Sequence, residues 1–85
     1  MSRAVLLEAV RLAQGGDWQT AHLVAQENEG DPLADWLHAV VHRMEGDLAN
    51  AGYWYRRCGR SLSPEVSTVA ELREIAVALG AGDPT

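Results

Sequence analysis

The sequence predicts an all-α protein built from two antiparallel helical hairpins and a C-terminal capping helix, five helices in total. Two Gly-Asp pairs, Gly16-Asp17 and Gly46-Asp47, each separate two segments with helical periodicity. Apolar residues recur at helical spacing, and no segment alternates between apolar and polar residues as a half-buried strand does. The chain of 85 residues has room for only one domain.

The first hairpin is predicted over residues 4–28, with helices at about 4–14 and 18–27. Its joint is Gly16-Asp17. Glycine readily adopts the left-handed backbone conformation that ends a helix, and aspartate accepts the free backbone N–H groups that begin the next helix. A joint this short indicates two helices that pack side by side.

The second hairpin is predicted over residues 32–59, with helices at about 33–45 and 48–58 joined at Gly46-Asp47. Asp31 is expected to cap the first of these helices, because Pro32 fits its first position, where no N–H group is needed. The helix at 33–45 is apolar around most of its circumference. Such a helix is either deeply buried or part of a protein contact, so a homodimer is one possibility.

A capping helix is predicted over residues 64–80, starting near Ser63-Pro64. Thr68 and Glu71 have the spacing of a capping box, in which each side chain caps a backbone N–H group of the other residue. An apolar stripe at helical spacing should face the hairpins; it consists of Val69, Leu72, Ile75, Ala76 and Leu79.

The two hairpins also repeat each other. Gly16-Asp17 with Ala21 and Gly46-Asp47 with Ala51 are thirty residues apart, which is typical of a helical solenoid. The segments "LLEAVRLAQGGDWQTAHLVAQENEGDP" and "WLHAVVHRMEGDLANAGYWYRRCGRSLSP" resemble tetratricopeptide-type repeats, although His38 follows Leu37 where that family has glycine. The resemblance implies a concave groove, lined by the first and third helices, that binds a protein or peptide. The block "HR-x-EGD-x-x-NA-x-YWYRR" is also similar to one in small bacterial proteins.

The amino-acid composition argues against several classes of function. A net charge of −5 argues against binding to nucleic-acid phosphates. A single cysteine, Cys58, excludes an internal disulfide and any multi-cysteine metal site. No apolar run is long enough to span a membrane, so a cytoplasmic protein without membrane contact is expected. No pattern of catalytic residues stands out, and we expect a non-enzymatic protein.

The candidate site lies on the third helix, where Asp35, His38, His42 and Glu45 are spaced to share one face. Histidines four residues apart on a helix can hold zinc or another divalent metal, and a carboxylate one turn away can add a ligand. The metal hypothesis therefore uses His38, His42 and Glu45, and His22 on the second helix could approach them. The pattern lacks the glutamate that follows the first histidine of metalloproteases.

A structural interpretation explains the same residues without a ligand. His38 or His42 would then be half-buried where helices meet and hydrogen-bonded to a neighbour. Asp47 would cap the fourth helix, and Arg43 would pair with Glu45 or Asp47 to hold the hairpin turn.

A recognition interpretation assigns a polar and aromatic strip to partner binding: His38, His42, Arg43, Tyr53 and Arg57. Within Tyr53-Trp54-Tyr55, helical geometry places Tyr53 away from the predicted core, so it should be the most exposed of the three. Aromatic residues next to arginine are typical of interface hot spots. The leading prediction is thus a protein-interaction module or scaffold. The alternatives are a metal-binding protein and a small scaffold with an engineered binding surface.

Overall fold

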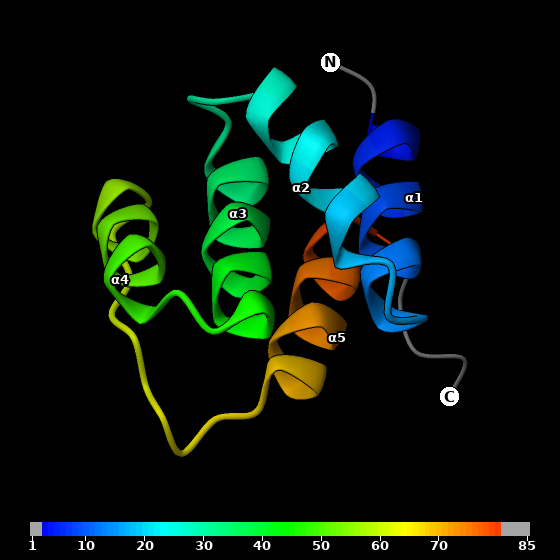
Figure 1. Cartoon of the computed structure of the whole chain (residues 1–85). Helices are drawn as coiled ribbons and strands as arrows, with labels where there is room; N and C mark the ends of the chain where they lie inside the picture. Colours follow the sequence, from blue (N-terminus) through cyan, green and yellow to red (C-terminus); the bar gives the residue numbers. More distant parts are fainter. Residues whose placement is uncertain (1–2, 81–85) are drawn as a thin grey trace.

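The computed structural model describes residues 3–80, and these residues form five α-helices and no strand (Figure 1). The helices are α1 (Arg3–Gln14), α2 (Trp18–Glu27), α3 (Pro32–Glu45), α4 (Leu48–Arg57) and α5 (Thr68–Ala78). The predicted all-α fold with five helices is confirmed. Within the described residues, every helix is too short or too polar to cross a membrane.

The two Gly-Asp joints have the same local structure. Gly16 and Gly46 have φ angles of 97° and 90°, in the left-handed region that favours glycine. Asp17 and Asp47 cap the following helices by accepting the backbone N–H groups of Thr20 and Asn50. The structure therefore supports the internal repeat, and Ala21 and Ala51, at equivalent positions, are both fully buried.

Helix α3 lies at the centre of the molecule. Every residue from Ala34 to His42 is buried, because α2, α4 and α5 all pack against this helix. The apolar circumference of α3 thus reflects deep burial within the chain. The same burial forces the polar residues of α3 to find partners among the neighbouring helices.

Helix α5 packs against α3 and α1, the first helices of the two hairpins, and Figure 1 shows it between them. The groove that the tetratricopeptide resemblance implies on α1 and α3 is therefore covered by α5. Leu72 and Ile75, from the predicted apolar stripe, are the side chains of α5 that are most deeply buried there.

The predicted start of the capping helix was wrong. The helix begins at Thr68, four residues after Pro64, because Ser67 is the N-cap and its side chain accepts the N–H group of Ala70. Glu71 does not complete a capping box. Val69 was also wrongly placed in the buried stripe, since it is 75% exposed.

Glu71 instead joins three helices. Its carboxylate accepts hydrogen bonds from the Trp36 indole nitrogen at 2.9 Å, from the Tyr55 hydroxyl at 2.7 Å and from the Arg43 guanidinium. Arg43 also donates to the carbonyl oxygen of Val66 at 2.8 Å, which ties the loop before α5 to α3. Burial, followed by the bond to Glu71, raises the pKa of Tyr55.

This network corrects the expected partner of Arg43. The side chains of Arg43 and Glu71 are only 10% and 9% exposed, and they form a buried ion pair between α3 and α5. Arg43 therefore does not hold the hairpin turn through Glu45 or Asp47. The turn depends on its own caps, with the N–H group of Asp47 donating to the carbonyl oxygen of His42 at 2.8 Å.

Replacing Glu71 with glutamine should lower the free energy of unfolding by about 3–5 kcal/mol, because the buried Arg43 charge loses its partner. Urea denaturation followed by circular dichroism measures this change. E74Q is the matched control: Glu74 is exposed on the same helix, so its substitution should change stability by less than about 0.5 kcal/mol. Equal stability of E71Q and E74Q would contradict the structural role of Glu71.

Candidate functional site

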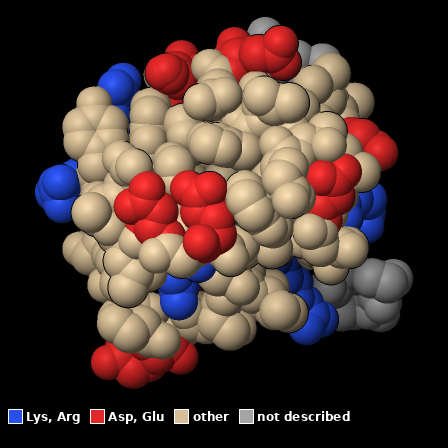
Figure 2. Space-filling view, viewed as in Figure 1, with Lys and Arg blue, Asp and Glu red and all other residues tan. Residues whose placement is uncertain are grey.

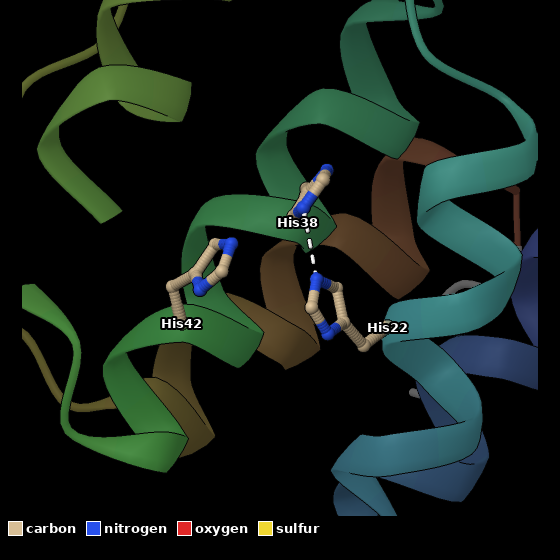
Figure 3. Close-up of side chains that lie close together, drawn as sticks. All are labelled: His22, His38 and His42. Carbon is tan, nitrogen blue, oxygen red and sulfur yellow. Dashed lines mark hydrogen bonds between the residues drawn. The ribbon is translucent and has the colours of Figure 1, made fainter. Parts of the chain in front are cut away.

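Three histidines converge between α2 and α3 (Figure 3). His22 comes from α2, and His38 and His42 come from successive turns of α3. One ring nitrogen of each lies within 4.8 Å of the other two, and Nε2 of His22 lies 3.0 Å from Nε2 of His38. His38 and His42 are 3% and 7% exposed, and His22 is half-buried.

The hairpin geometry explains why these groups meet. In two antiparallel helices, residues equally distant from the connecting loop lie at the same level. His22 and His38 are each eight residues from Gly30 (30 − 22 and 38 − 30), in the loop between α2 and α3. Trp54 and His38 are each eight residues from Gly46 (54 − 46 and 46 − 38), at the joint between α3 and α4. His38 is therefore flanked by His22 on one side and by Trp54 on the other.

Trp54 forms an aromatic wall of the histidine cluster. Its ring stacks on the ring of His38 with a centroid distance of 3.9 Å and an angle of 17° between the planes. His38 is in turn stacked against His42, with centroids 4.9 Å apart. The guanidinium carbon of Arg57 lies 4.9 Å from the Trp54 centroid on α4, so a cation–π contact also holds this ring.

Glu45 orients the third histidine. Its carboxylate accepts a hydrogen bond from Nδ1 of His42 at 2.6 Å. In a neutral imidazole this hydrogen bond places the proton on Nδ1 and leaves the lone pair on Nε2. A carboxylate that fixes a histidine in this way is the usual outer partner of a metal-binding imidazole.

The environment keeps His38 and His22 uncharged at neutral pH. Burial, with smaller contributions from His22, His42 and Arg57, lowers the pKa of His38 to about 4. Burial and the neighbouring His42 also lower the pKa of His22. A neutral imidazole has a lone pair that a proton would otherwise occupy, so both rings are in the form that binds metal ions.

Nδ1 of His38 is a buried polar atom without a hydrogen-bond partner. In a network with a purely structural role, buried polar atoms are normally satisfied, and leaving one unpaired costs about 1–3 kcal/mol. The unpaired nitrogen therefore lowers the stability of the folded protein, and no hydrogen bond within the described residues compensates for it. The close approach of the three rings makes the cluster the strongest candidate for a site in the described residues.

The structure brings together only part of the predicted metal set. His38 and His42 lie side by side as expected, and His22 completes their group. Glu45 contacts this group through His42, and a second group of potential ligands consists of His42, Glu45 and Asp47. Asp35, the fourth polar residue of the predicted face, is buried and accepts the N–H group of Gly30 at 3.2 Å.

Some residues of the predicted recognition strip are buried and others are exposed. His38, His42 and Arg43 lie inside the molecule, as the structural interpretation expected for the histidines. Tyr53 is 44% exposed, as predicted, and its hydroxyl accepts a hydrogen bond from the exposed Arg57 at 3.2 Å. A partner at the surface of the folded protein would therefore meet Tyr53 and Arg57.

Acidic side chains lie near the centre of the face shown in Figure 2. Acidic surfaces attract cations. No family model matches the chain, and comparisons with curated proteins and with solved structures found no match.

The low pKa of His38 predicts that the metal-free protein loses stability in acid. The unfolded chain takes up a proton near pH 6.5, whereas the folded protein does so only near pH 4. As the pH falls between these values, proton binding therefore favours unfolding, by about 3 kcal/mol in total. Urea denaturation at several pH values measures this loss.

The H38Q variant separates the contribution of His38 from that of other titrating groups. This variant should show a smaller decrease in stability between pH 6.5 and pH 4 than the wild type. If the wild type and H38Q showed the same pH dependence, His38 would have the same pKa in the folded and unfolded states. That result would contradict the effect of burial on the pKa of His38.

Proposed function

We propose that this protein binds a divalent transition-metal ion through His22, His38 and His42. The observation that carries the proposal is the convergence of three imidazole nitrogens within 4.8 Å of one another at a buried helix contact. Imidazole ligands favour zinc, copper, nickel and cobalt over magnesium and calcium, which prefer oxygen. The expected ligand is therefore an ion of the zinc type.

The distances are compatible with one ion. In a tetrahedral zinc site the Zn–N bonds are about 2.0–2.1 Å, which places two ligand nitrogens roughly 3.3 Å apart. His22 and His38 are already close to this separation, at 3.0 Å. The ligand nitrogen of His42 would have to move by roughly 1.5 Å or less to reach the same separation. Rotation of the imidazole rings can supply a movement of this size. Upon binding, the hydrogen bond between His22 and His38 would be replaced by two bonds to the metal.

The surrounding residues support the same role. Glu45 fixes the tautomer of His42, and Trp54 fixes the orientation of the His38 ring. Three protein ligands leave a fourth coordination position for water or a bound molecule, the arrangement typical of metal sites that interact with a ligand. Burial of two of the three ligands limits competition from bulk water.

Zinc should therefore bind in a one-to-one ratio and stabilise the fold. At a free zinc concentration one hundred times the Kd, the free energy of unfolding should rise by about 2.7 kcal/mol. Isothermal titration gives the Kd and the ratio, and urea denaturation with and without zinc gives the stabilisation. The H22Q variant should lose most of the affinity while remaining folded, because His22 is only half-buried.

Further variants distinguish this site from the second group of potential ligands. E45Q should weaken binding by about 10–100-fold through His42, whereas E27Q, an exposed change on α2, should have no effect. D47N should also bind zinc as the wild type does. If D47N abolished binding and H22Q did not, the ion would lie at His42, Glu45 and Asp47. The absence of stoichiometric binding by the wild-type protein would refute the proposal.

Protein recognition is a second candidate, favoured by the exposed pair formed by Tyr53 and Arg57 on α4. Exposed aromatic and arginine side chains in contact are frequent in binding hot spots. Proteins that crosslink to the wild type should be lost with Y53A and retained with V77A, because Val77 is exposed on α5. An unchanged set of crosslinked proteins with Y53A would exclude this surface.

A further inference from the structure

A second feature lies on the other side of α3, away from the histidines. Residues two positions apart on a helix point about 200° apart, so Trp36 and His38 face nearly opposite directions. The guanidinium carbon of Arg60, in the loop after α4, lies 3.4 Å above the centroid of the Trp36 ring. Trp36 is only 4% exposed, whereas Arg60 is exposed. The arginine therefore covers one face of the tryptophan.

Two cavities meet at this contact. One has a volume of about 360 Å³ and the other about 440 Å³, and Trp36, Arg60 and Glu74 line both. The backbone N–H group of Arg60 donates to the carbonyl oxygen of Tyr55 at 2.7 Å, which anchors the residue. Its side chain lies on the ring of Trp36 and lines both cavities.

The walls of the smaller cavity have the chemistry of a site for an organic cation. Trp36 and Tyr55 supply aromatic surfaces, and the exposed Glu74 supplies a carboxylate. Aromatic rings beside carboxylates attract guanidinium and ammonium groups through cation–π and ionic interactions. Arg60 shows that a guanidinium group fits against Trp36, because this chain places one there itself.

We propose that the smaller cavity binds the guanidinium group of an arginine side chain in a peptide, and that Arg60 occupies its place in the free protein. The incoming guanidinium stacks on Trp36 and pairs with Glu74 at the entrance. A planar guanidinium stacks on an aromatic ring and forms paired hydrogen bonds with a carboxylate, which a lysine ammonium cannot reproduce. This proposal does not depend on metal binding.

The test uses N-acetyl-arginine amide as the probe, with N-acetyl-citrulline amide as an uncharged analogue of similar shape. Titrations are followed by NMR at the Trp36 indole N–H, which donates to Glu71 inside the network. The R60Q variant removes the competing guanidinium and should bind the arginine probe about tenfold more tightly than the wild type. R56Q, which removes another exposed arginine from α4, should bind it as the wild type does.

Further comparisons make the outcome decisive. In the R60Q background, E74Q should weaken binding of the arginine probe several-fold, and the citrulline probe should bind at least tenfold more weakly than arginine. H22Q should leave this binding unchanged. Equal binding of the arginine probe by R60Q and the wild type, equal binding of the two probes, or no shift of the Trp36 signal at millimolar probe would overturn the proposal.

Discussion

Helix α3 is buried on all sides, and its buried polar side chains require hydrogen-bond partners. This requirement determines which residues the neighbouring helices place against α3. From Ala34 to His42 no residue reaches the surface appreciably, yet this segment includes an aspartate and two histidines, and Arg43 follows directly. A buried polar group without a partner is costly, so each of these residues requires a matching group on a neighbouring helix. The packing of α2, α4 and α5 around α3 supplies those groups.

The two polar systems on α3 differ in how completely they are satisfied. On one side, the Glu71 carboxylate accepts three donors and joins α3, α4 and α5 into a fixed unit. On the other side, the histidine cluster has one hydrogen bond between rings, one to Glu45, and an unpaired Nδ1 on His38. The first system is complete by itself, whereas in the second an ion would replace the hydrogen bond between His22 and His38 by bonds to the metal.

Metal binding would also add to the packing of α2 on α3. Helix α2 has two fully buried residues, Ala21 and Ala25, and Trp18 and Val24 are partly buried against the core. An ion held by His22 and by two residues of α3 would link the helices directly. Binding to the folded state alone stabilises that state, so occupancy of the site would be coupled to the docking of α2.

Local features of the fold could be predicted from the sequence, because each depends on neighbouring residues. The Gly-Asp joints, the cap formed by Asp31 and the exposure of Tyr53 rest on backbone preferences or helical spacing. The position of α5 and the partner of Arg43 could not be predicted from the sequence. Glu71 is 28 residues from Arg43, and the sequence of the loop before α5 does not determine where that helix packs.

The candidate site could be predicted from the sequence only in part. The sequence places His38 and His42 on one face of a helix, but the third member of the cluster comes from another helix. Equal distances from Gly30 were a usable signal for His22, because a short loop fixes the level at which two antiparallel helices meet. The same rule from Gly46 finds Trp54, for which helical spacing alone predicts only a core position. The unpaired nitrogen of His38 could be found only in the structure.

X-ray absorption spectroscopy of the zinc-loaded protein tests the central claim most directly, because it reports the atoms bound to the metal. The account predicts three imidazole nitrogens at about 2.0–2.1 Å and one further light-atom ligand. Coordination by one imidazole together with carboxylate oxygens would place the ion at His42, Glu45 and Asp47 and contradict the three-histidine site.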